Sequence, residues 1–180
     1  MDITYFVHSI TEDNEKGLAT GWLSGKLSSE GIDRAKKLSN ELSDRNFDAV
    51  FSSDLARAID STHLFFKDHF PVYIDWRLRE CNYGSKDGLP AADFKKNREQ
   101  DYIDVNYPDG ESYLDVEKRM RSFIRDLQNT FDYESIAIVG HQAPQLALDV
   151  IIQKMTWTQA IKNDWRKKGA WQPGWEYCLD

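Results

Sequence analysis

Ile3-Thr-Tyr-Phe-Val-His8 is an apolar run that ends in a histidine, and the turn-forming residues Thr11-Glu-Asp-Asn14 follow shortly after it. This pattern predicts a strand that delivers an imidazole to the edge of a sheet. Ser135-Ile-Ala-Ile-Val-Gly-His141 repeats the arrangement. Because ligands of α/β sheets bind outside the carboxyl ends of the strands, we expect His8 and His141 to share one site.

Helical patterns alternate with short apolar runs along the rest of the chain. We expect strands at about residues 3–7, 48–51, 71–74, 135–139 and 175–179, and helices at about 30–43, 55–66, 91–99, 112–131, 144–154 and 156–167. Ser28 or Ser29 is expected to cap the first helix, and Asp54 the second. Such alternation is typical of an α/β fold, so we predict a single three-layer domain over residues 1–180, with a mostly parallel central sheet and helices on both faces.

Residues 77–112 interrupt this alternation. Gly84, Gly88, Pro90, Pro108 and Gly110 punctuate the segment. A loop region of this size in a compact domain is often functional, so we interpret it as an irregular lid.

Composition excludes several classes of protein. The 180 residues carry a net charge of −7, and the longest basic run is three residues, Arg166-Lys167-Lys168, which argues against a nucleic-acid partner. No apolar stretch approaches the roughly 20 residues that a membrane span needs. The first residues lack the basic and long apolar regions of a signal peptide, so we expect a cytoplasmic protein with no membrane partner.

Two cysteines far apart, Cys81 and Cys178, provide neither a disulfide framework nor a CxxC metal pattern. The two histidines also lack companions at metal-ligand spacing, so we expect no metal and no cofactor. They fit better as a nucleophile and a hydrogen-bond donor. The C-terminal quarter is rich in tryptophan, and these side chains could pack internally or against a second copy in a homo-oligomer.

Two charged residues could complete a site for an anion. Arg57 stands in the first turn of a predicted helix, where a cation opposes the helix dipole. That placement is reasonable if Arg57 turns toward a bound anion and holds it bidentately. Glu80, in Leu78-Arg-Glu-Cys-Asn-Tyr-Gly84, is a candidate general acid if it lies near the histidines.

Together these pieces resemble the histidine phosphatase superfamily, which has the phosphoglycerate mutase-like fold. The family opening Arg-His-Gly corresponds to Val7-His8-Ser9, and its Glu-Thr-x-x-Asn to Ile10-Thr-Glu-Asp-Asn14. Further matches, in order along the chain, are Gly21-Trp22, Leu27–Gly31, Ser52–Ala58, Leu78–Gly84, Gly110–Ser112, Arg119 and His141-Gln142.

The resemblance implies phosphoryl transfer through a phosphohistidine on a small phosphorylated molecule. His8 would be the nucleophile, Arg57 and His141 would bind phosphoryl oxygens, and Glu80 would protonate the leaving alkoxide. Ser9, Asn14 and Gln142, together with backbone N–H groups near Gln142, would complete the substrate site. The many acidic residues of the lid favour hydrolysis over mutase activity, because they do not suit a highly anionic substrate.

Three positions depart from the family pattern. Val7 replaces an arginine, and Ser9 and Gln142 each replace a glycine. One lost charge-assisted contact corresponds to roughly 10–100-fold in rate or affinity. Two outcomes therefore stay open: a phosphatase with a remodelled pocket, or a weakly active or inactive relative that binds a phosphorylated ligand or serves a regulatory role.

Overall fold

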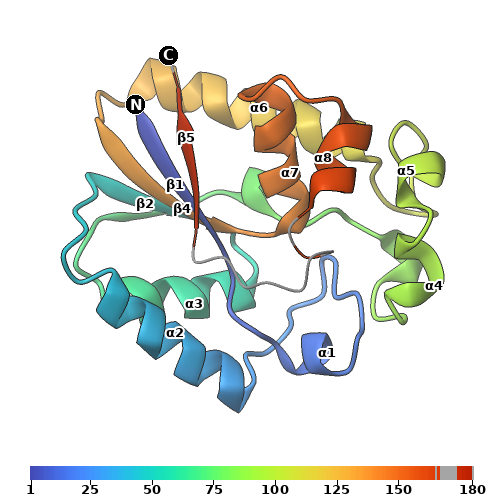
Figure 1. The fold of residues 1–180 in the computed structure, drawn as a ribbon, viewed down its shortest axis with the longest axis horizontal. Coiled ribbons are helices and arrows are strands. Elements are labelled where there is room, and N and C mark those ends of the chain that lie inside the picture. Colours follow the sequence, from blue (N-terminus) through green and yellow to red (C-terminus); the bar gives the residue numbers. More distant parts are fainter. Residues whose placement is uncertain (165, 167–173, 180) are drawn as a thin grey trace.

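A five-stranded sheet forms the centre of the protein (Figure 1). The computed structural model describes residues 1–164, 166 and 174–179. The strand order is β3-β2-β4-β1-β5, and only the pairing of β5 with β1 is antiparallel within the described residues. The strands are β1 Asp2–Val7, β2 Ala49–Ser52, β3 Val72–Ile74, β4 Ser135–Gly140 and β5 Trp175–Cys178.

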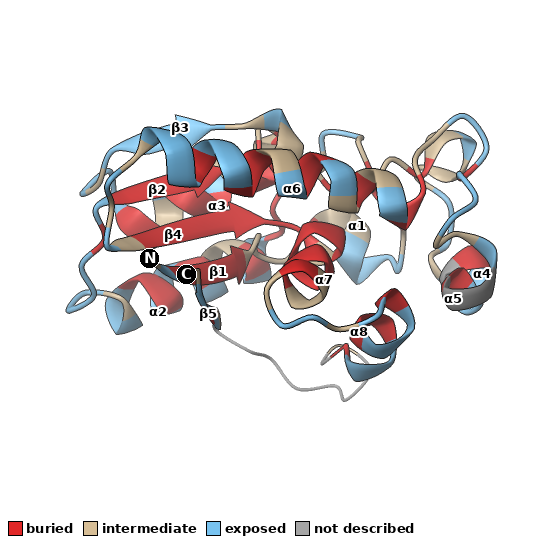
Figure 2. Ribbon diagram, turned by 90° about the horizontal axis from the view of Figure 1, so that it is seen from above, coloured by how far each residue is buried: buried red, intermediate tan, exposed pale blue. Residues whose placement is uncertain are grey.

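Helices cover both faces of the sheet, which confirms the predicted single three-layer α/β domain (Figures 1 and 2). One face carries α2 Ser29–Glu41 and α3 Ala56–Phe66, and the other carries α6 Tyr113–Thr130, α7 Gln142–Ile151 and α8 Trp157–Asn163. Shorter elements are α1 Glu12–Glu15, α4 Ala92–Lys95, α5 Arg98–Asp101 and the 3-10 helices η1 Trp76–Leu78 and η2 Gly84–Lys86.

Two apolar clusters hold these layers together. The larger lies between the sheet and α6, α7 and α8, and includes Ile138, Met120 and Trp157. The smaller lies under α2 and α3, where Phe6 contacts Phe66 edge to face. The alternation of side chains along β1 and β4 supplies both clusters, since successive residues of a strand point to opposite faces.

The strand register brings the predicted site residues together. Val7 is opposite Gly140, and Ser52 is opposite Val139, in parallel pairings. The residues that follow these strands therefore emerge side by side at one edge of the sheet. His8 and His141 both lie there, as the sequence predicted.

Several predicted boundaries were wrong. Helix α7 begins at Gln142 rather than 144, because His141 has extended backbone and is itself the N-cap. The helix predicted at 156–167 ends at Asn163, and residues 165 and 167 lie outside the described residues. The single helix predicted at 91–99 is two short helices, α4 and α5. Helix α1 was not predicted; a capping box between Thr11 and Asn14 starts it.

Asp54 does not cap α3, contrary to the sequence prediction. The N-cap is Leu55, and it has no side-chain capping bond. The Asp54 carboxylate instead accepts two hydrogen bonds from Arg79, at 2.7 Å from Nε and 2.6 Å from Nη2. This bidentate pair joins the segment before α3 to the segment that carries Glu80, a long-range contact that local sequence patterns do not reveal.

The predicted lid is packed against the domain rather than detached from it. Tyr83, Phe94 and Tyr107 are buried in the larger apolar cluster. The ring of Tyr102 stacks on Tyr107 with centroids 3.8 Å apart. Burial of these aromatic rings fixes the segment on the core despite its irregular backbone.

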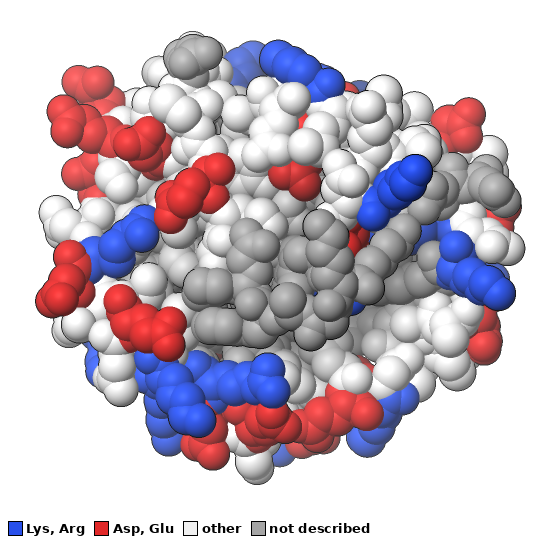
Figure 3. Space-filling view, in the orientation of Figure 1, with Lys and Arg blue, Asp and Glu red and all other residues white. Residues whose placement is uncertain are grey.

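Charged side chains of both signs are interspersed on the face of the molecule shown in Figure 3. None of the helices described by the structure is long and apolar enough to cross a membrane. Neither cysteine is in a disulfide; Cys81 is buried and Cys178 is exposed on β5. The described residues contain no group of three or more His, Cys, Asp or Glu side chains arranged to hold a metal ion.

We expect Ile138→Ala to lower the free energy of unfolding by about 2–5 kcal/mol, because it leaves a cavity in the central strand. Ile138 is fully buried, whereas Ile74, on the edge strand, is 51% exposed. Ile74→Ala is the matched control and should lower the free energy of unfolding clearly less. Urea unfolding followed by circular dichroism measures both, and equal losses would contradict the assignment of Ile138 to the core.

Candidate active site

His8 directly follows β1 and is held by bonds on both sides. Its backbone N–H donates to Gly140 O at 3.0 Å, which extends the β1–β4 ladder by one residue. Its Nδ1 lies 2.7 Å from Ser9 O. Since a carbonyl oxygen only accepts hydrogen bonds, Nδ1 carries the ring proton in this contact. In the neutral form of this tautomer, the lone pair is on Nε2.

Arg57 provides the cation beside that lone pair. Its Nε donates a hydrogen bond to His8 Nε2 at 3.3 Å. The side chain is 2% exposed, and it projects from the first turn of α3, as predicted. Burial lowers the pKa of the Arg57 guanidinium, and the negative charge of Glu80 is the largest influence that opposes this shift.

The terminal nitrogens of Arg57 face a loop rather than an open anion site. Nη1 donates to Leu23 O at 2.7 Å, and Nη2 donates to Gly21 O at 2.7 Å. The loop can approach so closely because Gly25 has a φ of +63° and lacks a side chain, whose Cβ would lie 3.1 Å from Arg57 Cδ. We expected Arg57 to hold an anion bidentately. In this structure its two terminal nitrogens donate to backbone carbonyls instead.

His141, the N-cap of α7, lies beside His8. The centroids of the two rings are 5.0 Å apart. Its backbone is fixed by the Tyr5 hydroxyl, which accepts from His141 N at 2.7 Å and donates to His141 O at 2.8 Å. Burial is the main influence that holds the pKa of His141 well below its usual value, and the positive charge of Arg57 adds to it. The ring is therefore neutral near pH 7.

Ser53 is a site residue to which the sequence analysis assigned no role. Its Oγ lies 2.9 Å from His141 Nε2, and both residues are fully buried. No protein partner of His141 Nδ1 exists among the described residues. When the Ser53 hydroxyl donates to Nε2, Nδ1 carries the proton and is a donor for a ligand. The available signal was the position of Ser53, directly after β2 within the Ser52–Ala58 motif.

Glu80 binds the N-terminus of α7 through its carboxylate. Oε1 accepts from Cys81 N and from Ala143 N, both at 2.9 Å, and Oε2 accepts from Gln142 N at 3.2 Å. In this structure the N–H groups near Gln142, which we expected to bind a substrate anion, donate to Glu80, and their contact with substrate stays a prediction. The free N–H groups of the helix attract the nearest carboxylate, and that carboxylate is Glu80.

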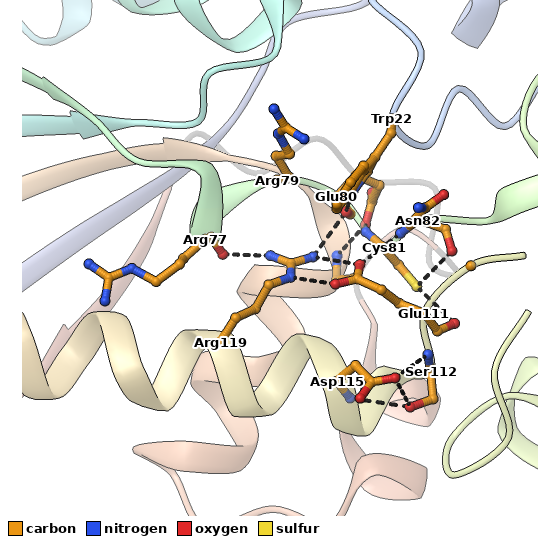
Figure 4. A network of polar contacts seen from close by, with 12 residues as sticks. Trp22, Arg77, Arg79, Glu80, Cys81, Asn82, Glu111, Ser112, Asp115 and Arg119 are labelled. Carbon is orange, nitrogen blue, oxygen red and sulfur yellow. Dashed lines mark hydrogen bonds and ion pairs between the residues drawn. The ribbon is translucent and has the colours of Figure 1, made fainter.

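A polar network fixes the backbone of Glu80 (Figure 4). The Glu80 carbonyl accepts from Trp22 Nε1 at 2.7 Å and from Arg119 Nη2 at 2.9 Å. Arg119 is in turn paired with Glu111, Nε to Oε1, at 3.0 Å. Gly110 permits this approach, because a Cβ there would lie 2.3 Å from Asn82 O. The Gly110–Ser112 and Arg119 motifs thus position the segment that carries Glu80.

The three predicted substrate-binding side chains make bonds within the fold. Ser9 Oγ donates to Gly31 O at 2.6 Å. Asn14 Oδ1 accepts from Thr11 N at 3.1 Å in the capping box of α1. Gln142 Nε2 donates to Asp164 Oδ2. Contact of these three residues with substrate stays a prediction.

Comparison with protein families places this chain in a known group. The model of the histidine phosphatase superfamily (branch 1) matches residues 6–170. The chain belongs to this superfamily. The match contains both strand-end histidines, Arg57 and Glu80, and agrees with the resemblance inferred from the motifs.

Curated relatives and solved structures extend the comparison. A 2,3-bisphosphoglycerate-dependent phosphoglycerate mutase of Staphylococcus aureus (strain JH9) is 34% identical over 147 residues, which cover 68% of this chain and 64% of the mutase. The α-ribazole phosphatase of Shigella flexneri has a TM-score of 0.78 at 27% identity, covering 89% of this chain and 83% of that one. A mycobacterial glucosyl-3-phosphoglycerate phosphatase in complex with VO3 has a TM-score of 0.80 at 25% identity, covering 89% and 86%.

We expect His141 to stay neutral as the pH falls from about 7.5 to about 6, because its pKa lies well below the unfolded value of about 6.5. Unfolded His141 binds a proton in this range and the folded residue does not, so stability declines below about pH 6.5. Ring ¹⁵N chemical shifts from NMR measure the protonation state directly. A titration midpoint at or above 6.5 would contradict the proposed environment of His141.

Proposed function

We propose that the protein hydrolyses a small phosphate monoester through a phosphohistidine intermediate on His8. The observation that carries this proposal is the contact of Nδ1 with Ser9 O, which leaves the lone pair on Nε2, where it accepts a hydrogen bond from Arg57 Nε. Attack on phosphorus requires the release of that bond. A neutral imidazole with a fixed tautomer is a competent nucleophile for phosphorus. His141 Nδ1 would donate to a phosphoryl oxygen.

In the first step, His8 Nε2 forms an N–P bond while the ester P–O bond breaks. The leaving alkoxide takes a proton from the acid form of Glu80, which has gained that proton from solvent before the step. In the second step, water attacks phosphorus, its proton returns to Glu80, the N–P bond breaks and phosphate leaves. Oε2 is the better candidate to carry that proton, since its contact with Gln142 N is longer than the two contacts of Oε1.

Two observations support hydrolysis rather than mutase activity. The solved relatives include phosphatases, although the curated relatives are named as mutases and the chain spans 64% of their length. The basic residues of the lid are also partly engaged: Arg98 pairs with Asp164 at 2.9 Å, and Lys86 Nζ lies 5.6 Å from the centroid of Phe94. A mutase must bind a substrate with two phosphate-bearing positions, which requires additional accessible cations.

A second candidate function is binding of a phosphorylated ligand without turnover. Val7 favours it, because the family pattern has an arginine at this position and a valine gives the transferring phosphoryl group no charged partner. The two functions differ in whether covalent phosphate forms on His8.

We expect His8→Ala to reduce hydrolysis of an aryl phosphate by at least about 1,000-fold, as is usual when a nucleophile is removed. The assay should include the wild type quenched during turnover and tested for phosphate that is acid-labile and attached to His8. His69→Ala removes an exposed histidine and is the matched control. Tight phosphate binding without phosphohistidine or released phosphate would favour the ligand-binding alternative.

We expect Val7→Arg to tighten binding of inorganic phosphate by about 10–100-fold, because it adds a charge-assisted contact next to His8. Val7→Met is the control for side-chain length without charge. Isothermal titration calorimetry measures both variants. If the arginine variant binds no more tightly than the methionine variant, the pocket is organised around an uncharged residue at position 7.

A further inference from the structure

A buried carboxylate near the candidate active site has no role in the proposed reaction. Asp164 follows α8 and is 3% exposed. Its Oδ2 accepts from Arg98 Nη2 at 2.9 Å and from Gln142 Nε2. Its Oδ1 accepts from Arg166 N at 3.1 Å and from Arg166 Nη1 at 2.9 Å. Asp164 thus joins three separate segments of the chain.

One of those segments is the N-terminus of α7. Gln142 is the first residue of that helix and directly follows His141. Its side chain is bound to Asp164, while its backbone N–H donates to Glu80 Oε2 at 3.2 Å. A single residue therefore connects the buried carboxylate with the proposed general acid. Gln142 stands where the family pattern has a glycine, which could not make this connection.

Another segment is the lid. Arg98 is the first residue of α5, and its side chain is only 5% exposed. A buried guanidinium requires a partner, because an unpaired charge in the interior is costly. Asp164 is that partner. The segment predicted as a lid is consequently attached to the same carboxylate as the first turn of α7.

We propose that Asp164 is a positioning residue, which acts through Gln142 to hold Glu80 and the first turn of α7 in place and couples them to α5. The inference rests on the proposed function only for its effect on turnover. The link itself is a property of the folded protein. Glu80 is the group that would contact the leaving oxygen, whereas Asp164 acts on Glu80 through Gln142.

Electrostatics favour the ionised form of Asp164. Burial alone would raise the pKa of this carboxyl, but the charges of Arg166 and Arg98 outweigh that effect and lower it. An ionised carboxylate accepts hydrogen bonds and donates none. It therefore orients the Gln142 amide with Nε2 toward itself, so the side chain has one defined orientation.

The test compares Gln142→Met and Asp164→Asn with the wild type. Gln142→Met keeps the side-chain length and the Arg98–Asp164 pair but removes the amide donor. Hydrogen exchange at the Ala143 amide reports how often the hydrogen bond between Glu80 and the first turn of α7 opens, because Ala143 N donates to Glu80 Oε1 at 2.9 Å. We expect exchange to become about 10-fold faster or more in both variants, because each loses a hydrogen bond to a charged group.

Kinetics separate a positioning role from a merely structural one. Departure of an alkoxide needs protonation by Glu80, whereas an activated aryl leaving group needs it far less. Gln142→Met should lower kcat for glycerol phosphate by about 10-fold and for 4-nitrophenyl phosphate by less than about threefold, with KM changed less than about twofold. Equal losses on both substrates, or none, would overturn the proposal.

Matched controls lie on the same helix. Gln145 Nε2 donates to Asp149 Oδ2 at 2.8 Å, a second glutamine–aspartate pair farther along α7. Gln145→Met and Asp149→Asn should leave Ala143 exchange and the substrate ratio unchanged, and an equal effect there would contradict a specific role for Asp164. Asp164→Asn leaves Arg98 without its charged partner, so thermal unfolding must show that this variant folds.

Hydrogen exchange at Ala143 also distinguishes a failure of this inference from a failure of the proposed function. If the wild type forms no phosphohistidine on His8, the proposed reaction fails, yet faster Ala143 exchange in Gln142→Met would still support the link. If phosphohistidine forms but Ala143 exchange is the same in all proteins, the reaction stands and the role of Asp164 is wrong.

Discussion

Parallel pairing of β1 with β4 and of β4 with β2 is the constraint on which the rest of the structure depends. Because the strands run in one direction and end nearly level, His8, His141 and Ser53 emerge at the same edge of the sheet. The cores on both faces fix that register, since a shift by one residue would move every side chain of a strand to the opposite face. Core packing therefore brings the site residues together, and polar contacts then fix their orientation.

The fold and the central residues of the site could be predicted because they follow local rules. Apolar runs ending in His8 and His141 indicated strands, and helical spacing indicated the covering layers. The predictions failed where partners come from far along the chain. Aspartate is a residue type that favours the N-cap of a helix, yet the Asp54 carboxylate pairs with Arg79, 25 residues later in the sequence. Tertiary ion pairs of this kind leave no periodic signal in a sequence.

The same limit applies to the polar groups around the nucleophile. We predicted Gln142 as a substrate ligand, which stays a prediction; in this structure its side chain is bound to a buried carboxylate 22 residues later in the sequence. We also predicted that N–H groups of α7 bind an anion, and in this structure they donate to Glu80. Charge within the site is thus largely balanced by the protein itself. A dianionic substrate would have to compete with Glu80 and with the loop carbonyls that hold Arg57.

The two cysteines give the protein an internal reporter of local opening. Cys81 follows Glu80, is fully buried, and donates its backbone N–H to the Glu80 carboxylate, whereas Cys178 lies exposed on β5. A thiol reagent reaches Cys81 only when this segment separates from the core, because buried groups react through transient local unfolding. The alkylation rate of Cys81, referred to that of Cys178, would therefore measure how often the segment carrying Glu80 opens, with no introduced label.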